Sequence, residues 1–339
     1  MKRRHFLLAL GSAGCSRDRR PRLNVFNWSN YAAPDTIRRF EAEFGVRVRY
    51  GIYESNEEML ARVMSGNSGW DVVFPSNSLI RPMRELNLLA PLRPDRLTNA
   101  GHLDAAFRAP VWDPKLEWSI PFMWGGTGIA YNRSLAPAPR AWSDFWDPRL
   151  KGRITMLDDP ADVIAACLKK LGYSINTEEP KQLLEAQQQA FAIKPLLRAY
   201  VNAEVRDQLV AGDVLAAQMW STIAQQAIDA SPQLRFIFPR EGFLLYMDCA
   251  VVLRESKRQE LAHRFLDYLL RPDVSAQIGG YCRTATANAG ARLLLSEADR
   301  ANRTLYPDAE TMARGEWTSS FTPEAQKLRD RLWTEIKSA

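Results

Sequence analysis

The stretch LNVFNWSNYAAPDTIRRFEAEFGVRVRY, residues 23–50, decides the fold class of this chain. Its short apolar run Leu23–Phe26 predicts a strand. Ala33–Phe44 predicts a helix, because Pro34 lies in its first turn, apolar residues recur on one face, and Gly45 follows it. Alternating apolar and arginine residues over 46–50 then predict a second strand. This order of strand, helix and strand indicates an α/β protein.

The same alternation continues further along the chain. Helices are predicted at Asn56–Ser65 and Ser78–Leu86 around a short buried strand at Asp71–Phe74, which completes a first lobe by about residue 120. The segment SIPFMWGGTGIAYN, residues 119–132, carries glycines in a strand-like run, which allow a bend or the close approach of another group. A helix-rich region, an apolar run at Phe243–Leu253, and helices at Gln259–Leu270 and Pro323–Lys337 follow.

Length and charge narrow the class of protein. The 339 residues are enough for about two domains, and 46% hydrophobic with 25% charged residues is an ordinary globular composition. The net charge of +6 comes from residues 1–22, which hold seven basic side chains and one acidic side chain. The rest of the chain, from Leu23 to Ala339, has 38 basic and 38 acidic residues. This neutral body excludes a chain-wide basic surface for nucleic acid.

The first 15 residues, MKRRHFLLALGSAGC, predict a signal peptide with a basic start, a short apolar stretch and small residues before Cys15. Arg3-Arg4 resembles a twin-arginine export signal, and Ser12–Cys15 resembles a lipobox whose cysteine is lipidated. We expect a tether over 16–22 and a periplasmic protein anchored by lipid at Cys15. The alternative is a basic tail on a cytosolic protein. No other stretch has the roughly 20 apolar residues needed to cross a bilayer.

The residues of common catalytic and metal sites are scarce. The body has two histidines, His102 and His263, and neither lies near cysteines or carboxylates at metal-ligand spacing. There is no nucleophile elbow, P-loop or dinucleotide-binding motif. We therefore expect no metal, no cofactor and no enzymatic activity. Three further cysteines are interpreted as small buried apolar residues, with one disulfide as the alternative: Cys167, Cys249 and Cys282.

Aromatic and acidic residues gather at predicted strand ends, where α/β proteins bind ligands. An ammonium group gains about 0.5–2 kcal/mol over an aromatic face, and a charge-assisted hydrogen bond to a carboxylate adds about 1.5–3 kcal/mol. The pattern thus favours a site for an organic cation. The residues that build it are Trp28, Tyr31, Asp159, Asp162, Trp220, Tyr246 and Asp248.

Each of these residues also has a structural interpretation. The tryptophans and Tyr31 could be core residues. Asp159, directly before Pro160, could cap the helix Ala161–Leu171. Asp248 lies inside an apolar run, where a lone acid is costly to bury unless a partner such as an arginine pairs with it.

A series of motifs from about Leu23 to past Trp317 carries a resemblance to a known family. They are FNWSNY (26–31), YESNE (53–57), DVVFPS (71–76), SIPFMWG (119–125), LGYS (171–174), MD (247–248), LRPDV (270–274), LYPDAET (305–311) and GEW (315–317). In this order they resemble the bacterial periplasmic spermidine/putrescine-binding proteins, the solute receptors of polyamine ABC transporters.

The resemblance implies a two-lobe α/β fold with a strand hinge and a ligand cleft between the lobes. The first lobe would hold residues 23–125 and about 249–290, and the second about 126–248 and 291–339. It also implies a putrescine- or spermidine-type ligand, ABC permease subunits in the inner membrane as partners, and a monomer in the periplasm. The open alternatives are another amine or small solute, a sensor without transport, and a secreted enzyme.

Carried over residue by residue, the family pattern gives the predicted site residues definite roles. Trp28 and Tyr31 match first-lobe aromatics, Trp220 matches a second-lobe aromatic, and Tyr246 takes the place of a tryptophan. Asp159 matches a carboxylate that grips an amine, Asp162 stands where the family has a glutamate, and Asp248 matches the acid that holds a terminal ammonium. Other positions depart from the pattern: Asn30 replaces an acid, Ser78 or Asn77 an aromatic, and Thr318 a glutamine, while Thr284, next to Arg283, falls at a ligand-facing tyrosine.

Overall fold

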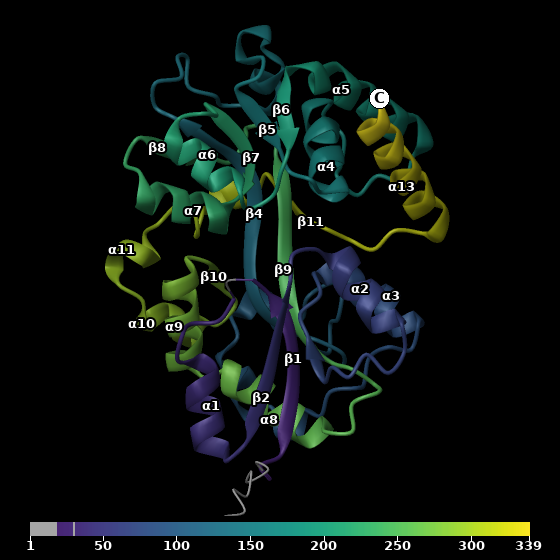
Figure 1. Cartoon of the computed structure of the whole chain (residues 1–339), viewed down its shortest axis with the longest axis vertical. Helices are drawn as coiled ribbons and strands as arrows, with labels where there is room; N and C mark the ends of the chain where they lie inside the picture. The colour runs from purple at the N-terminus through teal and green to yellow at the C-terminus, as the bar shows by residue number, and fades with distance from the viewer. Residues whose placement is uncertain (1–18, 30) are drawn as a thin grey trace, which may run out of the picture.

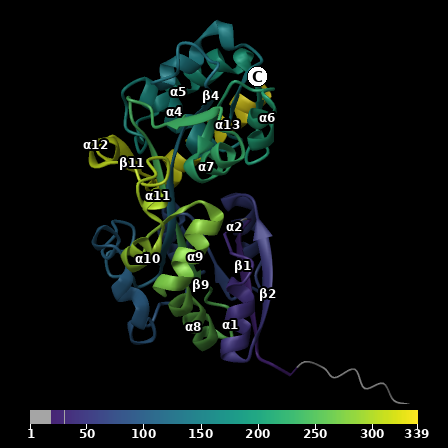
Figure 2. The same ribbon diagram turned by 90° about the vertical axis from the view of Figure 1, so that its left-hand side faces the viewer.

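The computed structural model describes residues 19–29 and 31–339. The predicted signal peptide with Cys15 and the ligand-site candidate Asn30 lie outside them. The chain forms two α/β lobes, which lie one above the other in Figure 1. Figure 2 shows the same division from the side, with α1, α2, α8 and α9 in one lobe and α4 to α7 and α13 in the other.

The first lobe is built on three parallel strands. β1 pairs with β2 over Arg22–Trp28 and with β3 at Val25 and Phe26, as expected when a helix returns the chain to the same sheet. The elements of this lobe are β1 (Arg22–Trp28), α1 (Thr36–Phe44), β2 (Arg47–Tyr53), α2 (Asn56–Met64), β3 (Val72–Val73), η1 (Asn77–Leu79), α3 (Ile80–Glu85), η2 (Pro94–Arg96), η3 (Thr98–His102), η4 (Ala105–Phe107), α8 (Gln259–Leu269), α9 (Pro272–Cys282), β10 (Ala285–Thr286) and α10 (Ala289–Leu294).

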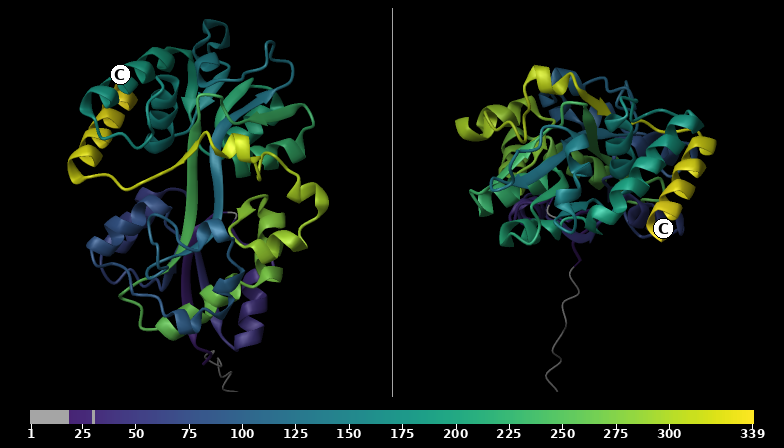
Figure 3. Two further views of the ribbon diagram at one scale, coloured as in Figure 1. Left: turned by 180° about the vertical axis from the view of Figure 1, so that it is seen from behind. Right: turned by 90° about the horizontal axis from the view of Figure 1, so that it is seen from above.

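Two long antiparallel strands connect the lobes. β4 (Ile120–Asn132) and β9 (Phe243–Val252) pair with each other near the middle of the molecule. β9 continues into the first lobe, where it pairs with β3, and β4 continues into the second lobe, where it pairs with β7 and β8. Seen from behind in Figure 3, both strands run through the boundary between the lobes, and the chain that leads to α13 crosses it as well.

The second lobe extends the sheet in the order β4, β7, β5, β6. The elements of this lobe and of the connecting segment are η5 (Trp142–Trp146), η6 (Pro148–Leu150), β5 (Ile154–Met156), α4 (Pro160–Lys170), α5 (Pro180–Ile193), η7 (Lys194–Leu196), β6 (Leu197–Tyr200), α6 (Val205–Ala211), β7 (Ala216–Trp220), α7 (Ser221–Ala230), β8 (Leu234–Ile237), α11 (Glu297–Arg300), α12 (Ala309–Met312), β11 (Gly315–Trp317) and α13 (Pro323–Ser338).

The predicted elements are present, with shifted ends. The helix expected from residue 33 begins at Thr36, because Asp35 is the residue before its first turn. The helix expected over 78–86 is a 3-10 turn followed by α3. The glycines of β4 allow other groups to approach its backbone closely, as predicted. A Cβ at Gly125 would collide with the Tyr246 hydroxyl and lie 2.8 Å from the Ser221 hydroxyl.

The buried apolar residues form separate cores. One cluster joins β1, β3, the first half of β4, β9, α8 and α9, while three smaller ones lie among α4 to α7, α13 and the second half of β4. Leu295, Leu305 and Tyr306 pack with the first core, although the sequence placed 291–339 in the second lobe. Part of the chain between α10 and β11 therefore packs against the first lobe, and α13 packs with two of the smaller clusters in the second lobe.

The cysteines behave as small apolar residues. Cys167, Cys249 and Cys282 are buried and unpaired, so the alternative of a disulfide among them is wrong. Within residues 19–29 and 31–339, no helix is long and apolar enough to span a membrane, and no group of histidine, cysteine and carboxylate side chains has the arrangement of a metal site.

Candidate ligand-binding site

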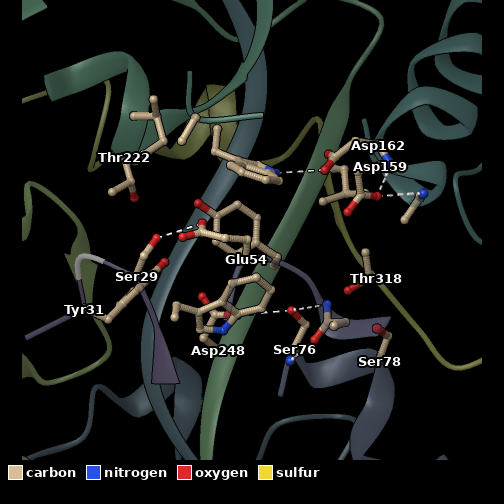
Figure 4. A pocket seen from close by; sticks show the side chains of 18 residues that line it. Ser29, Tyr31, Glu54, Ser76, Ser78, Asp159, Asp162, Thr222, Asp248 and Thr318 are labelled. Carbon is tan, nitrogen blue, oxygen red and sulfur yellow. Dashed lines mark hydrogen bonds between the residues drawn. The ribbon is translucent and has the colours of Figure 1, made fainter. Parts of the chain in front are cut away.

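A cavity of about 120 Å³ lies between the two lobes, beside the strands that connect them. Figure 4 draws the 18 described residues that line it. Nine of the predicted site residues are among them: Trp28, Tyr31, Ser78, Asp159, Asp162, Trp220, Tyr246, Asp248 and Thr318. Residues that are up to 290 positions apart in the sequence therefore face one enclosed space.

The first-lobe aromatic wall is held by the end of β1. The Trp28 indole nitrogen donates a hydrogen bond of 2.8 Å to the Phe74 carbonyl, and its ring centroid lies 4.7 Å from that of Tyr53. Tyr31 follows the strand, and its hydroxyl is near enough to Asp248 to lower the pKa of that carboxyl. Both residues pack partly against the first core and also line the cavity, so the core interpretation holds in part and their contact with a ligand stays a prediction.

The second-lobe aromatic wall is held by the end of β7 and by β9. The Trp220 indole nitrogen donates a hydrogen bond of 2.8 Å to Asp162 Oδ2. The Tyr246 hydroxyl lies near Thr222 and Ser221 at the start of α7, which lower its pKa against the raising effect of burial. The hydrogen bond of Trp220 holds that ring in place before any ligand enters the cavity.

The N-terminus of α4 points at the cavity and carries two acids. Asp159 is the N-cap: its Oδ1 accepts hydrogen bonds from the amides of Ala161 at 2.8 Å and Asp162 at 3.1 Å. The capping interpretation is thus confirmed, and it engages only one of the two carboxylate oxygens. A bare helix N-terminus repels cations, and two carboxylates in this turn reverse that preference.

Asp162 is buried and accepts hydrogen bonds on both oxygens. Thr127 of β4 donates to Oδ1, and Trp220 donates to Oδ2. Burial raises the pKa of Asp162 to about 6, although both hydrogen bonds lower it. Burial also raises the pKa of Asp159, to which the nearby charges of Asp162 and Glu57 contribute. A cation placed beside Asp159 and Asp162 would lower the pKa of both carboxyl groups.

Asp248 is the acid at the hinge strand β9. It is 3% exposed, Ser76 Oγ donates to it at 3.1 Å, and the Tyr31 hydroxyl lies close by. Among the described residues no lysine or arginine lies within ion-pair distance of Asp248, so the alternative of a structural arginine is wrong. Burial raises the pKa of Asp248 to about 7, against the lowering effect of the two hydroxyls.

The charges around the cavity all have one sign. The lining residues include the carboxylates Glu54, Asp159, Asp162 and Asp248 and, within the described part of the chain, no lysine, arginine or histidine. In Figure 4, Asp159 and Asp162 lie together on one side and Asp248 lies apart from them near Ser76. Carboxylates at two separated positions between aromatic faces suit an extended molecule with more than one positive charge.

Two of the predicted positions have other surroundings. Thr284 is buried and is not among the residues that line the cavity. Its hydroxyl accepts a hydrogen bond of 3.1 Å from Thr222, which does line it. Arg283 likewise brings no cation into the cavity, since it forms ion pairs of 2.6 Å with Asp229 and Asp299. Of the two candidates at the next position, Ser78 lines the cavity and Asn77 is buried beneath it.

Several lining residues have no distinctive local sequence pattern. Asn56 and Ser76 hydrogen-bond each other, Ser76 also donates to Asp248, and Ser29 donates to Glu54 at 2.8 Å. Thr222 connects the second lobe to Thr284. Glu54, Asn56 and Ser76 lie inside motifs that carried the family resemblance, and this was the one available signal for them.

The chain is similar in sequence to proteins of a known family. A family model described as bacterial extracellular solute-binding protein matches residues 35–300. This chain belongs to that family. As a solute-binding protein it is 34% identical to the spermidine/putrescine-binding periplasmic protein of Escherichia coli strain K12, over 99% of this chain and 98% of the relative. It is 32% identical to the putrescine/cadaverine-binding protein of Pseudomonas aeruginosa, over 93% of each chain.

Solved structures agree with the fold of this solute-binding protein. The spermidine/putrescine ABC transporter substrate-binding protein of Streptococcus pneumoniae has a TM-score of 0.83 and 29% identity, covering 94% of this chain and 99% of its own. A lipoprotein of Treponema pallidum has a TM-score of 0.84 and 26% identity, covering 93% and 99%. The family resemblance and the two-lobe fold expected from the sequence are confirmed.

Proposed function

We propose that this protein is the extracytoplasmic receptor of an ABC importer, and that it binds a linear polyamine between its lobes and delivers it to a membrane permease. One observation carries the proposal. The cavity between the lobes combines aromatic walls with four carboxylates and, among described residues, no basic side chain. The names of the relatives, which are spermidine/putrescine-binding and putrescine/cadaverine-binding proteins, support the same ligand class.

The chemistry of the walls favours ammonium groups joined by methylene chains. Each ammonium can donate a charge-assisted hydrogen bond to a buried carboxylate, worth about 1.5–3 kcal/mol. The methylenes between them can pack against the faces of Trp28, Tyr31, Trp220 and Tyr246. An anionic or neutral solute would leave the buried carboxylates without a partner.

Binding is expected to act through the position of the lobes. Trp28 and Tyr31 come from the first lobe, Asp162 and Trp220 from the second, and Asp248 from the connecting strand β9. A ligand that contacts all of them binds the closed arrangement more tightly than the open one, so it shifts the equilibrium towards closure. The closed form would then dock on the permease. The protein performs this role by binding, without catalysis.

The cellular location completes the proposal. We expect the mature protein to be a periplasmic monomer, held to the membrane by a lipid on Cys15 through the tether over 16–22. Mass spectrometry of the protein from membranes tests this: a diacylglyceryl-modified N-terminal Cys15 is expected, and loss of membrane attachment in Cys15→Ser. An unmodified chain in the soluble periplasmic fraction would contradict the anchor and leave the receptor function intact.

Isothermal titration calorimetry tests the ligand class. Putrescine, cadaverine, spermidine and spermine are titrated into the purified protein, with γ-aminobutyrate as a control of similar length and opposite charge at one end. We expect micromolar or tighter binding of at least one amine and none of the amino acid. Asp248→Asn should weaken binding about 100-fold or more, while Asp207→Asn on exposed α6 should leave it unchanged. No heat from any amine would refute the polyamine proposal.

A further inference from the structure

A second cavity adjoins the one already described. It has a volume of about 500 Å³ and lies between α2 and α3 of the first lobe, the start of α4, and the segment that leads into α13. Four residues line both cavities: Asn56, Ser78, Asp159 and Ala161. Ala161 is exposed and Ser78 is half-buried, so this second space forms the outer end of the cleft.

The partition between the two cavities is made of small side chains. Ser78 contributes a hydroxymethyl group and Ala161 a methyl group. No described residue forms a hydrogen bond with the Ser78 hydroxyl, and only its backbone carbonyl is engaged, by Ser320 Oγ at 2.7 Å. The gap between the two cavities is thus bounded at Ser78 and Ala161 by small side chains, and no hydrogen bond of the Ser78 hydroxyl closes it.

Two carboxylates from opposite lobes face this gap. Asp159 keeps one oxygen outside its capping hydrogen bonds, and the charge of Glu57 on α2 is close enough to raise the pKa of Asp159. Among described residues, none donates a hydrogen bond to Glu57 and none forms an ion pair with it. A cation between Glu57 and Asp159 would be attracted by both lobes at once.

The two arginines of the second cavity are already engaged by the protein and are not among the residues shared with the first. Arg81 donates to the Phe321 carbonyl at 3.0 Å and lies 3.9 Å from Glu85. Arg329 donates to the carbonyls of Ile175 and Thr177, and its guanidinium lies 3.9 Å above the Phe321 ring. The negative part of the second cavity is thus the part next to the gap.

We propose that the second cavity is an additional subsite for the same ligand, entered past Ser78 and Ala161, so that the preferred amine has at least three nitrogens and places one of them between Glu57 and Asp159. This rests on the proposed function and names the length of its substrate. Ser78 is then the residue that decides the length, because any larger side chain there closes the gap.

The test compares putrescine, spermidine and spermine by calorimetry on the wild type, Ser78→Phe and Ser78→Ala. The wild type should bind spermidine or spermine at least about tenfold more tightly than putrescine. Ser78→Phe should remove this preference by weakening the binding of spermidine and spermine at least about tenfold. Ser78→Ala keeps the gap open and should retain the preference for the longer amines.

A second variant checks the charge. Glu57→Gln should weaken the binding of spermidine and spermine by about threefold, since the site is partly exposed. The affinity for putrescine should stay unchanged. Glu310→Gln on α12, which is 92% exposed, is the matched control and should change nothing. Tighter binding of putrescine than of the longer amines, or an unchanged preference in Ser78→Phe, would overturn the proposal. Failure of every amine to bind would instead refute the function on which it rests.

Discussion

At the scale of single residues, the cavity is built from carboxyl groups whose charge is costly without a ligand. Asp248 is buried beside the hydroxyls of Ser76 and Tyr31, with no described cation within ion-pair distance, and burial raises its pKa to about 7. Burial likewise raises the pKa of Asp162, to about 6. A protein selected only for stability would avoid such groups, and a receptor for cations keeps them because the ligand supplies the missing charge.

Ligand affinity should therefore fall as the pH falls. Below about pH 7 the unliganded Asp248 holds a proton that an ammonium ligand must displace, while the ligand amines stay protonated. We expect affinity to drop by about tenfold per pH unit below 7. The drop should be steeper below 6, where Asp162 is also protonated in the empty protein. Calorimetry between about pH 8 and pH 5, in buffers of different ionisation enthalpy, should also detect proton release on binding. Affinity constant over this range would contradict the assignment of these acids to the site.

Asp248→Asn should stabilise the empty protein while it abolishes function. The native-state pKa is raised above the unfolded value of 3.8, so the stability contributed by this group is fully present below about pH 4 and is lost as the pH rises through 7. At about pH 8 the neutral amide should thus raise the free energy of unfolding by about 2 kcal/mol. Urea unfolding measures this. The gain should be smaller at about pH 5, and destabilisation at pH 8 would show that the carboxylate is structural.

At the scale of elements, α4 combines a structural and a binding role in its first turn. Pro160 and the capping Asp159 start the helix directly after β5, and this places Asp159 and Asp162 on the cavity wall. Seven residues of the helix, Asp162 to Leu168, are buried, which holds the turn rigidly. The orientation of the two acids thus follows from the packing of the whole helix.

Two substitutions at position 159 should separate capping from binding. Asp159→Ser keeps a good N-cap and removes the charge, so stability should stay within about 0.5 kcal/mol of wild type while polyamine affinity falls about tenfold or more. Asp159→Ala removes both the cap and the charge, and it should also lower the free energy of unfolding by about 0.5–2 kcal/mol. Thermal unfolding and calorimetry on the same samples measure the two effects. Wild-type affinity in Asp159→Ser would mean that Asp159 is only a cap.

At the scale of the whole molecule, contacts beside the cavity join the lobes without any ligand. Arg283, after α9 of the first lobe, pairs with Asp229 of α7 in the second, and Gln226 of α7 donates to the Cys282 carbonyl at 2.9 Å. Thr222 and Thr284 add the hydrogen bond next to the cavity. These contacts form only when the lobes are together, so they favour the closed arrangement.

Arg283→Ala should therefore weaken polyamine affinity by about twofold to fivefold, because a smaller fraction of the empty protein is closed. Small-angle X-ray scattering should show a larger radius of gyration for the empty variant and the wild-type value once ligand is saturating. Arg271→Ala is the matched control, since Arg271 pairs with Glu43 within the first lobe. An equal loss of affinity in both variants would point to general destabilisation in place of lost closure.

Much of the fold and part of the site follow from sequence pattern. Periodicity and turn residues predicted the strands and helices of the first lobe because these depend on neighbours in sequence. Helix ends shifted by a few residues, as at α1, which begins at Thr36 and not at residue 33. The site was predicted where a residue had an unusual local setting, such as Asp248 in an apolar run. Glu54 and Thr222 have ordinary settings and were not singled out.

The sequence by itself determined the α/β class, the neutral body, the cationic preference and half of the residues that line the cavity. Only the tertiary structure decided that the Thr284 hydroxyl bonds Thr222 and not a ligand, that Arg283 joins the lobes, and that Ser78 separates two cavities. The physical reason is that residue type and spacing fix local conformation and polarity. Contacts between lobes join residues far apart in the chain, so they depend on how the packed lobes meet.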